Sequence, residues 1–301
     1  MYTKSQDSET ACCRKCNSLP GVRMMHPLAG TAEVSPDELD AINGITTDLY
    51  TVMMIKNRCC CRTSCYGHTG CDFSYASVLF FRPGDRICLN GDTKAEGAGI
   101  VTFRKELAAG SEIERNMGEY RFFGYRTDEA LHVSECEERT LDRLFGDIKT
   151  ELGTCIDEYS CGIIGRRICL LLDYCRRFYN RQFIMRTDRN RKILRQTNHI
   201  IHDFFAQHGR QHEELPKAQY IAERTDTSAA YLEDLVKEET GLCLGQYAEM
   251  KRLDMARDLL MHSHKSDDEI ASILHYGSAR CFRLFFSRTT GMTTDQCRTS
   301  C

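Results

Sequence analysis

The fold is decided by two stretches of the sequence, IAERTDTSAAYLEDLVKEETG at residues 221–241 and IASILHYGSARCFRLFFSRTTGMTTDQCR at residues 270–298. Each begins with a short helical pattern, which is followed by a tight turn and by a second helical pattern that opens with small residues. Two helices joined by a tight turn form a helix-turn-helix unit. The sequence therefore predicts two such units in tandem, joined by one long helix.

Helical periodicity continues over the whole carboxy-terminal part of the chain, and no strand pattern interrupts it. Glycines stand in the short breaks between the helical patterns, where they suit helix ends: Gly209, Gly241, Gly277 and Gly291. We expect helices at 192–207, 216–224, 228–239, 244–261, 267–274, 278–289 and 293–299.

The two stretches resemble the paired helix-turn-helix units of the AraC/XylS family of transcription regulators. That family's second unit typically reads I-A-x-x-L-G-F, then a turn of small residues, then F-x-x-x-F-K-x-x-x-G-x-[ST]-P-x-x-[YF]-R. The segment QYAEMKRLDMARDLL at residues 246–260 resembles the family's linker helix. The residues in matching places are Ala222, Ser228, Tyr231, Leu232, Lys237 and Gly241 in the first unit, and Ile270, Ala271, Leu274, Phe282, Phe286, Gly291, Met292, Thr293 and Arg298 in the second.

Two upstream stretches extend the resemblance, EYRFFGYRTDEALHVSECE at residues 119–137 and LLDYCRRFYNRQFIMR at residues 171–186. They are similar to a subgroup of the same family, found among Bacteroidetes-type bacteria, that has a cupin-like sensor domain. The resemblance implies a sensor domain in this chain, but it does not identify a ligand.

Several residues depart from the family pattern. His275 stands where the family has the glycine of the second turn, and a non-glycine residue with a positive φ costs about 1 kcal/mol. Residues 192–301 contain 14 Lys and Arg against 16 Asp and Glu, a formal net charge of −2, so we expect weak non-specific affinity for DNA. The other departures are Thr225 and Thr227 in place of apolar residues, Ser287 in place of a basic residue, Thr294 in place of proline and Cys297 in place of an aromatic residue.

The amino-terminal part has a different sequence pattern from the helical carboxy-terminal part, because its short apolar runs are broken by glycine and by charged residues. The runs lie at 49–55, 73–81, 86–89 and 100–103, and the turn signal Arg82-Pro83-Gly84-Asp85 separates two of them. After residue 110 the period becomes helical, with a capping-box spacing at Ser134 and Glu137 and a long apolar helix face from Ile163 to Phe178.

These patterns predict an α+β protein, in which an amino-terminal β-sandwich or cupin-like domain with helices precedes an all-α domain with two helix-turn-helix units. A chain of 301 residues, 42% of them hydrophobic, is long enough for two domains with their own cores. We expect an amino-terminal arm at 1–45, a cupin-like sensor and dimerisation domain at 46–190, and a DNA-binding domain at 191–301. The polar segment 187–191 is expected to be the linker.

A recognition helix reads base edges with the side chains of its amino-terminal half, while other donors fix it against phosphates. We place Cys281, Phe282, Phe285 and Phe286 on the packed side of the second recognition helix. Without the resemblance, the arginines of this helix would be interpreted as solvated surface. The predicted DNA-binding residues are Ser228, Ala229, Ala230, Glu233 and Lys237 in the first unit and Ser278, Ala279, Arg280, Arg283 and Arg288 in the second.

The chain contains 18 cysteines, and the cluster Cys59, Cys60, Cys61, Cys65, His68 and Cys71 could in principle supply a tetrahedral zinc site. Three consecutive cysteines cannot all point one way on a strand, and no second C-x-x-C pair follows. We therefore expect mostly free thiols that pack as small hydrophobic side chains or are incidental.

The sequence gives no support for an enzyme. His68 is the single histidine between residues 45 and 115, so a cupin-type metal site of two or three histidines cannot form there. The G-x-S-x-G and phosphate-loop motifs are also missing. We expect no catalytic residue and no metal or other cofactor, and we interpret the basic-aromatic segment 176–183 as helix packing rather than as a nucleic-acid patch.

The resemblance thus implies a sequence-specific, DNA-binding transcription regulator that responds to a ligand through its amino-terminal domain. Its expected partners are double-stranded DNA, a small-molecule effector of unknown identity and RNA polymerase. The 163–175 face either packs within the chain or pairs with a second copy of it. Residues 1–10 are polar and no apolar run could span a membrane, so we expect a cytoplasmic protein without membrane contact. The alternative is a degenerate family member that acts as a protein-interaction or thiol- or metal-responsive module. The operator, and whether transcription rises or falls, are not encoded in any pattern.

Overall fold

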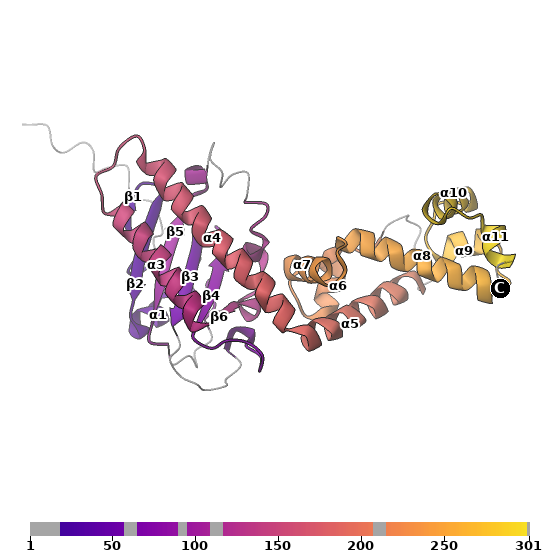
Figure 1. Ribbon diagram of the computed structural model, residues 1–301, viewed down its shortest axis with the longest axis horizontal. Coiled ribbons are helices and arrows are strands. Elements are labelled where there is room, and N and C mark those ends of the chain that lie inside the picture. Colours follow the sequence, from indigo (N-terminus) through magenta and orange to yellow (C-terminus); the bar gives the residue numbers. More distant parts are fainter. Residues whose placement is uncertain (1–18, 57–64, 90–94, 109–116, 207–214, 300–301) are drawn as a thin grey trace, which may run out of the picture. The chain divides into compact units, whose positions relative to one another are not determined.

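The computed structural model describes residues 19–56, 65–89, 95–108, 117–206 and 215–299. The chain divides into two compact units, Met1–Arg186 and Thr187–Cys301. The strands and helices of the first unit (Figure 1) are β1 (Arg23–His26), β2 (Ala29–Val34), α1 (Pro36–Ile42), β3 (Tyr50–Lys56), β4 (Ala76–Phe81), β5 (Gly97–Phe103), β6 (Leu131–Val133), α3 (Glu135–Leu152) and α4 (Ser160–Met185). Short 3-10 turns lie at Cys65–Gly67, Lys105–Ala108, Arg121–Gly124 and Thr127–Glu129.

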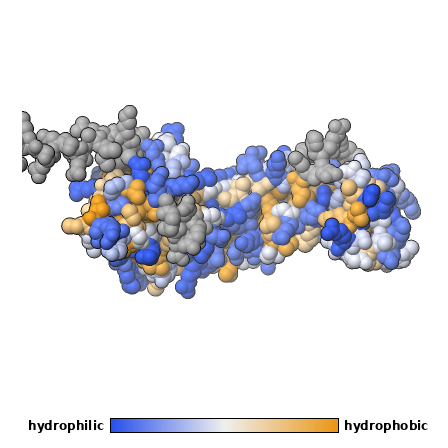
Figure 2. Space-filling model, turned by 90° about the horizontal axis from the view of Figure 1, so that it is seen from above, coloured by the Kyte–Doolittle hydropathy of each residue, from blue (hydrophilic) through white to orange (hydrophobic). Residues whose placement is uncertain are grey.

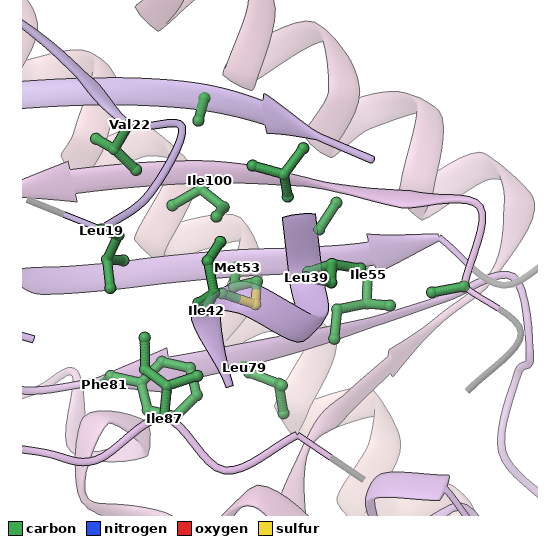
Figure 3. Packing of buried hydrophobic residues seen from close by; sticks show 14 of the residues in the cluster. Leu19, Val22, Leu39, Ile42, Met53, Ile55, Leu79, Phe81, Ile87 and Ile100 are labelled. Carbon is green, nitrogen blue, oxygen red and sulfur yellow. The ribbon is translucent and has the colours of Figure 1, made fainter. Parts of the chain in front are cut away.

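The six strands form one antiparallel sheet in the order β1-β2-β5-β3-β4-β6. Central strand β3 pairs with both neighbours in regular register, since Met53 lies opposite Leu79 of β4 and Ile100 of β5. These three residues point to one face, where they pack with Leu39 and Ile42 of α1 in a buried cluster (Figure 3).

Helices α3 and α4 cover the other face of the sheet (Figure 1). Gly99 of β5 allows α3 to approach closely, because a Cβ atom there would lie 3.3 Å from the ring of Phe145. Helix α3 begins at the predicted capping box, in which the Ser134 side chain accepts a hydrogen bond from the amide of Glu137. Since both faces of the sheet are covered, all six residues of β4 are buried.

The predicted α+β class is confirmed, and the described amino-terminal half takes the form of one sheet between α1 on one face and α3 and α4 on the other. Within the described residues, three local expectations are wrong. Residues 23–42 belong to β1, β2 and α1 instead of an arm, because β2 pairs along its whole length with β5. Run 86–89 forms no strand and contributes only an isolated bridge from Arg86 to Thr46. The supposed linker 187–191 is helical.

The second unit is helical throughout its described part. Its helices are α5 (Thr187–Ala206), α6 (Ala218–Thr225), α7 (Ala229–Thr240), α8 (Leu244–His262), α9 (Asp267–Ile273), α10 (Ala279–Thr290) and α11 (Thr294–Thr299). Helix α5 starts at Thr187 because Asn190 and Ile193 already lie on its buried face, although the surrounding residues are polar. No helix in the described parts of the chain is both long and apolar enough to cross a membrane.

Candidate nucleic-acid interface

Helices α7 and α10 are two copies of the same local structure, offset by 50 residues along the chain. Each has 12 residues and follows a serine N-cap, Ser228 or Ser278, whose side chain accepts a hydrogen bond from the third amide of the helix. Each ends at a left-handed glycine, Gly241 with φ 74° or Gly291 with φ 73°. Because serine caps and left-handed glycines are signals that act within a few residues, the sequence predicts both helices to within one residue.

The turns before α7 and α10 each contain one non-glycine residue in the left-handed region. In the first unit this is Asp226, with φ 53°, and in the second it is His275, with φ 58°, as expected where the family has glycine. The imidazole of His275 is buried, and its ring centroid lies 5.6 Å from those of both Phe204 and Phe205 of α5. This packing offsets the backbone strain that glycine would have avoided.

Threonines replace two apolar residues of the family pattern in the first turn, and the structure gives them a common polar role. Thr225 and Thr227 are buried, and their hydroxyls lie 2.9 Å apart. The Thr225 hydroxyl also donates to the carbonyl of Ile221 at 3.1 Å. Both hydroxyls introduced by these substitutions therefore form a hydrogen bond.

Helix α10, the expected second recognition helix, has buried residues on one side and exposed residues on the other. Ala279, Phe282 and Phe286 are buried on its inner side. The predicted contact residues Arg280, Arg283 and Arg288 are exposed. Leu284 is 56% exposed, although it is a large apolar residue that the sequence interpretation did not select.

Two residues of α10 lie on the opposite side from that expected. Ala279, predicted to contact DNA, is only 7% exposed, whereas Cys281, predicted to be packed, is exposed. The reason is helical geometry, since Ala279 is three residues before the anchoring Phe282 and shares its face, while Cys281 is one residue before it. Ala279 therefore supports α10 from inside the unit.

Asp267, the first residue of α9, contacts three side chains of the second helix-turn-helix unit. Its carboxylate accepts hydrogen bonds from Arg298 at 3.1 Å and from Thr294 at 3.0 Å, and it pairs with Arg283 at 3.4 Å. Thr294, which replaces the proline of the family pattern, thus gains a partner that proline could not have. Asp267 was not selected from the sequence, because its partners lie up to 31 residues away and no local pattern marks them.

Helix α7, the expected first recognition helix, has the same length as α10 but the opposite net charge. Its inner side is formed by Tyr231, Leu232, Leu235 and Val236. The predicted contact residues Ala229, Ala230 and Glu233 are half-buried, and Lys237 is exposed. Within its 12 residues α7 carries one lysine against Glu233, Asp234, Glu238 and Glu239, whereas α10 carries three arginines and no carboxylate. An anionic ligand is therefore attracted to α10 far more strongly than to α7.

Arg252 of α8 contacts the turn before α10. Its guanidinium lies 3.9 Å from the ring centroid of Tyr276 and donates to Glu249 at 2.8 Å. The Arg252 side chain is only 9% exposed, whereas the side chain of its partner Glu249 is 28% exposed. Burial raises the pKa of the Tyr276 hydroxyl well above its usual range. Arg252 is thus a positioning residue that linear sequence spacing does not reveal.

The other candidate sites do not gather into a reactive centre. Residues Cys59–Cys61 of the proposed zinc cluster lie outside the described residues, and within the described ones no group of three or more His, Cys, Asp or Glu could hold a metal ion. The segment 176–183 packs within the first unit, where Tyr179 stacks on Phe122 with centroids 5.5 Å apart. Among the described residues, the thiols that lie outside any disulfide include those of Cys71, Cys88, Cys136, Cys155, Cys161, Cys175, Cys243, Cys281 and Cys297.

Comparison with known proteins gives one family match, to the helix-turn-helix domain over residues 221–300. No curated protein matches the sequence. Among solved structures, the chain is similar to the C-terminal domain of AraT, a response regulator from Geobacillus stearothermophilus, with 24% identity over 36% of this chain and 85% of that one and a TM-score of 0.31. An AraC-type transcriptional regulator from Chromobacterium violaceum shares 23% identity over 36% of this chain and 90% of that one, with a TM-score of 0.31. ToxT from Vibrio cholerae shares 10% identity over 87% of this chain and 91% of that one, with a TM-score of 0.28.

Proposed function

We propose that this chain, whose residues 221–300 form an AraC-type helix-turn-helix domain, is a sequence-specific transcription regulator that binds double-stranded DNA through α7 and α10. The observation that carries the proposal is the repeated helix-turn-helix structure, in which two helices of equal length carry exposed charged residues, including Lys237 on α7 and Arg280 and Arg283 on α10. In such proteins a recognition helix enters the major groove, and two of them read half-sites about one helical turn apart.

The two recognition helices have unequal parts in this proposal. Arg280, Arg283 and Arg288 of α10 supply charge-assisted contacts to phosphates and to guanine, whose O6 and N7 atoms suit an arginine fork. Glu233 of α7 accepts a hydrogen bond from the N4 amino group of cytosine, and Lys237 contacts a phosphate. Affinity then comes mainly from α10, and α7 adds discrimination between sequences. Ser228 and Ser278 are helix caps, and they set where each helix begins.

The experiment that tests the proposal is selection from a random DNA library with the purified full-length chain at low salt. Enrichment of a bipartite motif, with half-sites about one helical turn apart, supports it. An absence of any enriched sequence would instead favour the alternative, in which the chain has lost DNA binding and acts as a protein-interaction module.

Responsiveness to a small-molecule effector is the second part of the proposal, and a pocket in the first unit supports it. The pocket lies between the sheet and α3 and has a volume of about 410 Å³, within the range that small-molecule sites occupy. Two ion pairs are formed by residues of its lining, Lys56 with Asp142 at 2.7 Å and Lys149 with Glu33 at 3.0 Å. Its lining is otherwise small or apolar, so it suits a compact ligand with both polar and apolar parts.

The pocket can be tested by filling it. Gly146 of α3 lines the pocket, and a Cβ atom there would meet nothing within 4 Å, so Gly146→Leu places a side chain in the pocket without backbone strain. We expect a compound that raises the melting temperature of the native chain to lose this effect in Gly146→Leu. The matched control is Gly162→Leu, on an exposed position of α4 outside the pocket. An equal shift in all three proteins would place the effector elsewhere.

A further inference from the structure

We infer that Leu284 contacts the C5-methyl group of a thymine in the major groove, and is therefore a specificity-determining residue of the second recognition helix. The inference rests on the proposed function, because it requires α10 to enter DNA. A single exposed leucine needs no explanation by itself. The position of this leucine within the charged face of α10 is what calls for one.

Leu284 stands in the middle of a row of arginines. Arg280, Leu284 and Arg288 are spaced four residues apart, so they lie along one line on the outer face of α10. All three are exposed, and the buried Phe282 and Phe286 anchor the opposite side of the helix. From the first to the last residue of the row is about 12 Å along the helix axis, so the row runs along most of the helix that would lie in the major groove.

The two ends and the centre of this row therefore suit different parts of the groove. The long side chains of Arg280 and Arg288 reach toward the phosphates or guanines at either side. The central side chain faces the edges of the base pairs, where the thymine methyl is the apolar group that a protein can contact. A leucine cannot form a hydrogen bond, so its contribution here comes from removing apolar surface from water.

Helix α7 provides the internal comparison for this assignment. The residue at the corresponding place, 50 positions earlier, is Asp234, so the leucine is not a requirement of the repeated helix. The core of α10 does not require it either, since the side chain is 56% exposed. Figure 2 shows hydrophilic and hydrophobic residues mixed over the viewed surface. On α10 the exposed Leu284 stands between two exposed arginines, Arg280 and Arg288.

The test replaces thymidine by deoxyuridine, which removes only the C5-methyl group. A site selected with the full-length native chain is substituted at one thymine at a time, and dissociation constants are measured for the native chain and for Leu284→Ala. We expect one substitution in the half-site bound by the second helix-turn-helix unit to weaken binding by the native chain about threefold to fivefold, as for one buried methyl group. Leu284→Ala should bind the thymidine and deoxyuridine sites equally.

Ile184→Ala is the matched control, because Ile184 is an apolar residue of the first unit that is 74% exposed. It should keep the full deoxyuridine effect, and thermal melts should show that both variants remain folded. A deoxyuridine effect that persists in Leu284→Ala, no deoxyuridine effect in the native chain, or a selected half-site without thymine would each overturn the inference while leaving the proposed function intact. Failure to select any site would refute the proposed function, and the inference with it.

Discussion

The three arginines of α10 are not equivalent, because only Arg283 has a carboxylate partner among the described residues. Arg283 pairs with Asp267, although its side chain is 53% exposed and such a pair contributes at most about 1 kcal/mol to stability. Arg280 is exposed and forms no ion pair with any described residue. Arg280 can therefore bind DNA without giving up a protein contact.

We predict that Arg280→Ala weakens binding to the selected site by about 1 to 3 kcal/mol and relaxes preference at one base pair, with little change in the melting temperature. Binding curves on matched and mismatched sites at fixed salt measure this. Arg257→Ala, which removes an exposed arginine of α8 outside the recognition helices, is the control. Equal weakening on matched and mismatched sites would reassign Arg280 to a phosphate.

His132 makes the stability of the first unit dependent on pH. Its ring is buried, with Nδ1 3.0 Å from the Ser77 hydroxyl and Nε2 3.2 Å from the carbonyl of Tyr66. Burial, and secondarily the positive charge of Arg186, lower the pKa of His132 from its usual 6.5. Below about pH 6.5, His132 of the unfolded chain therefore binds a proton that His132 of the folded chain does not bind. The free energy of unfolding decreases as the pH falls below 6.5.

We predict that the native chain loses about 2 kcal/mol through His132 between pH 7 and pH 5. Urea unfolding of the full chain at the two values measures the loss. His132→Gln should have a smaller pH dependence, because glutamine does not titrate. The exposed His199 provides the control variant His199→Gln, which should behave as the native chain. Identical pH profiles for the native chain and His132→Gln would contradict the prediction.

At the scale of elements, the sequence was informative where the signals are local. The limits of α7 and α10 follow from a serine cap and a left-handed glycine, and both lie within one residue of the prediction. Strand β2 was missed because what makes it a strand is its pairing with β5, about 70 residues later. The three-way contact of Asp267 was missed for the same reason.

The anchoring of α10 gives the element-scale prediction. Phe282 is fully buried and packs on Tyr276 with centroids 5.3 Å apart, whereas Phe285 is only partly buried. We expect Phe282→Ala to cost about 3 to 5 kcal/mol of stability, as for a buried aromatic residue, and Phe285→Ala to cost clearly less. Urea unfolding of both variants measures the difference. A smaller loss for Phe282→Ala than for Phe285→Ala would mean that α10 is rotated about its axis.

At the scale of the whole molecule, the division after Arg186 separates a unit with a pocket from a unit with the recognition helices. The second unit has its own buried core, including Phe204 and Phe205 of α5, Tyr231 of α7 and Phe286 of α10. These contacts are internal to residues 187–301. A core of this kind is what a domain needs in order to fold alone.

We predict that the fragment 187–301 folds cooperatively and binds the site selected with the full chain. Its formal charge is close to neutral and its positive charge is concentrated in part on α10, so specific contacts must supply most of the affinity and non-specific binding should be weak at physiological salt. Circular dichroism melts establish folding, and titration against selected and scrambled sites establishes specificity. The Arg280→Ala fragment is the control, because it should melt normally and lose the preference. A fragment that melts cooperatively yet binds both sites equally would show that specific DNA binding also requires residues 1–186. The inference that residues 187–301 alone recognise the DNA sequence would then be wrong.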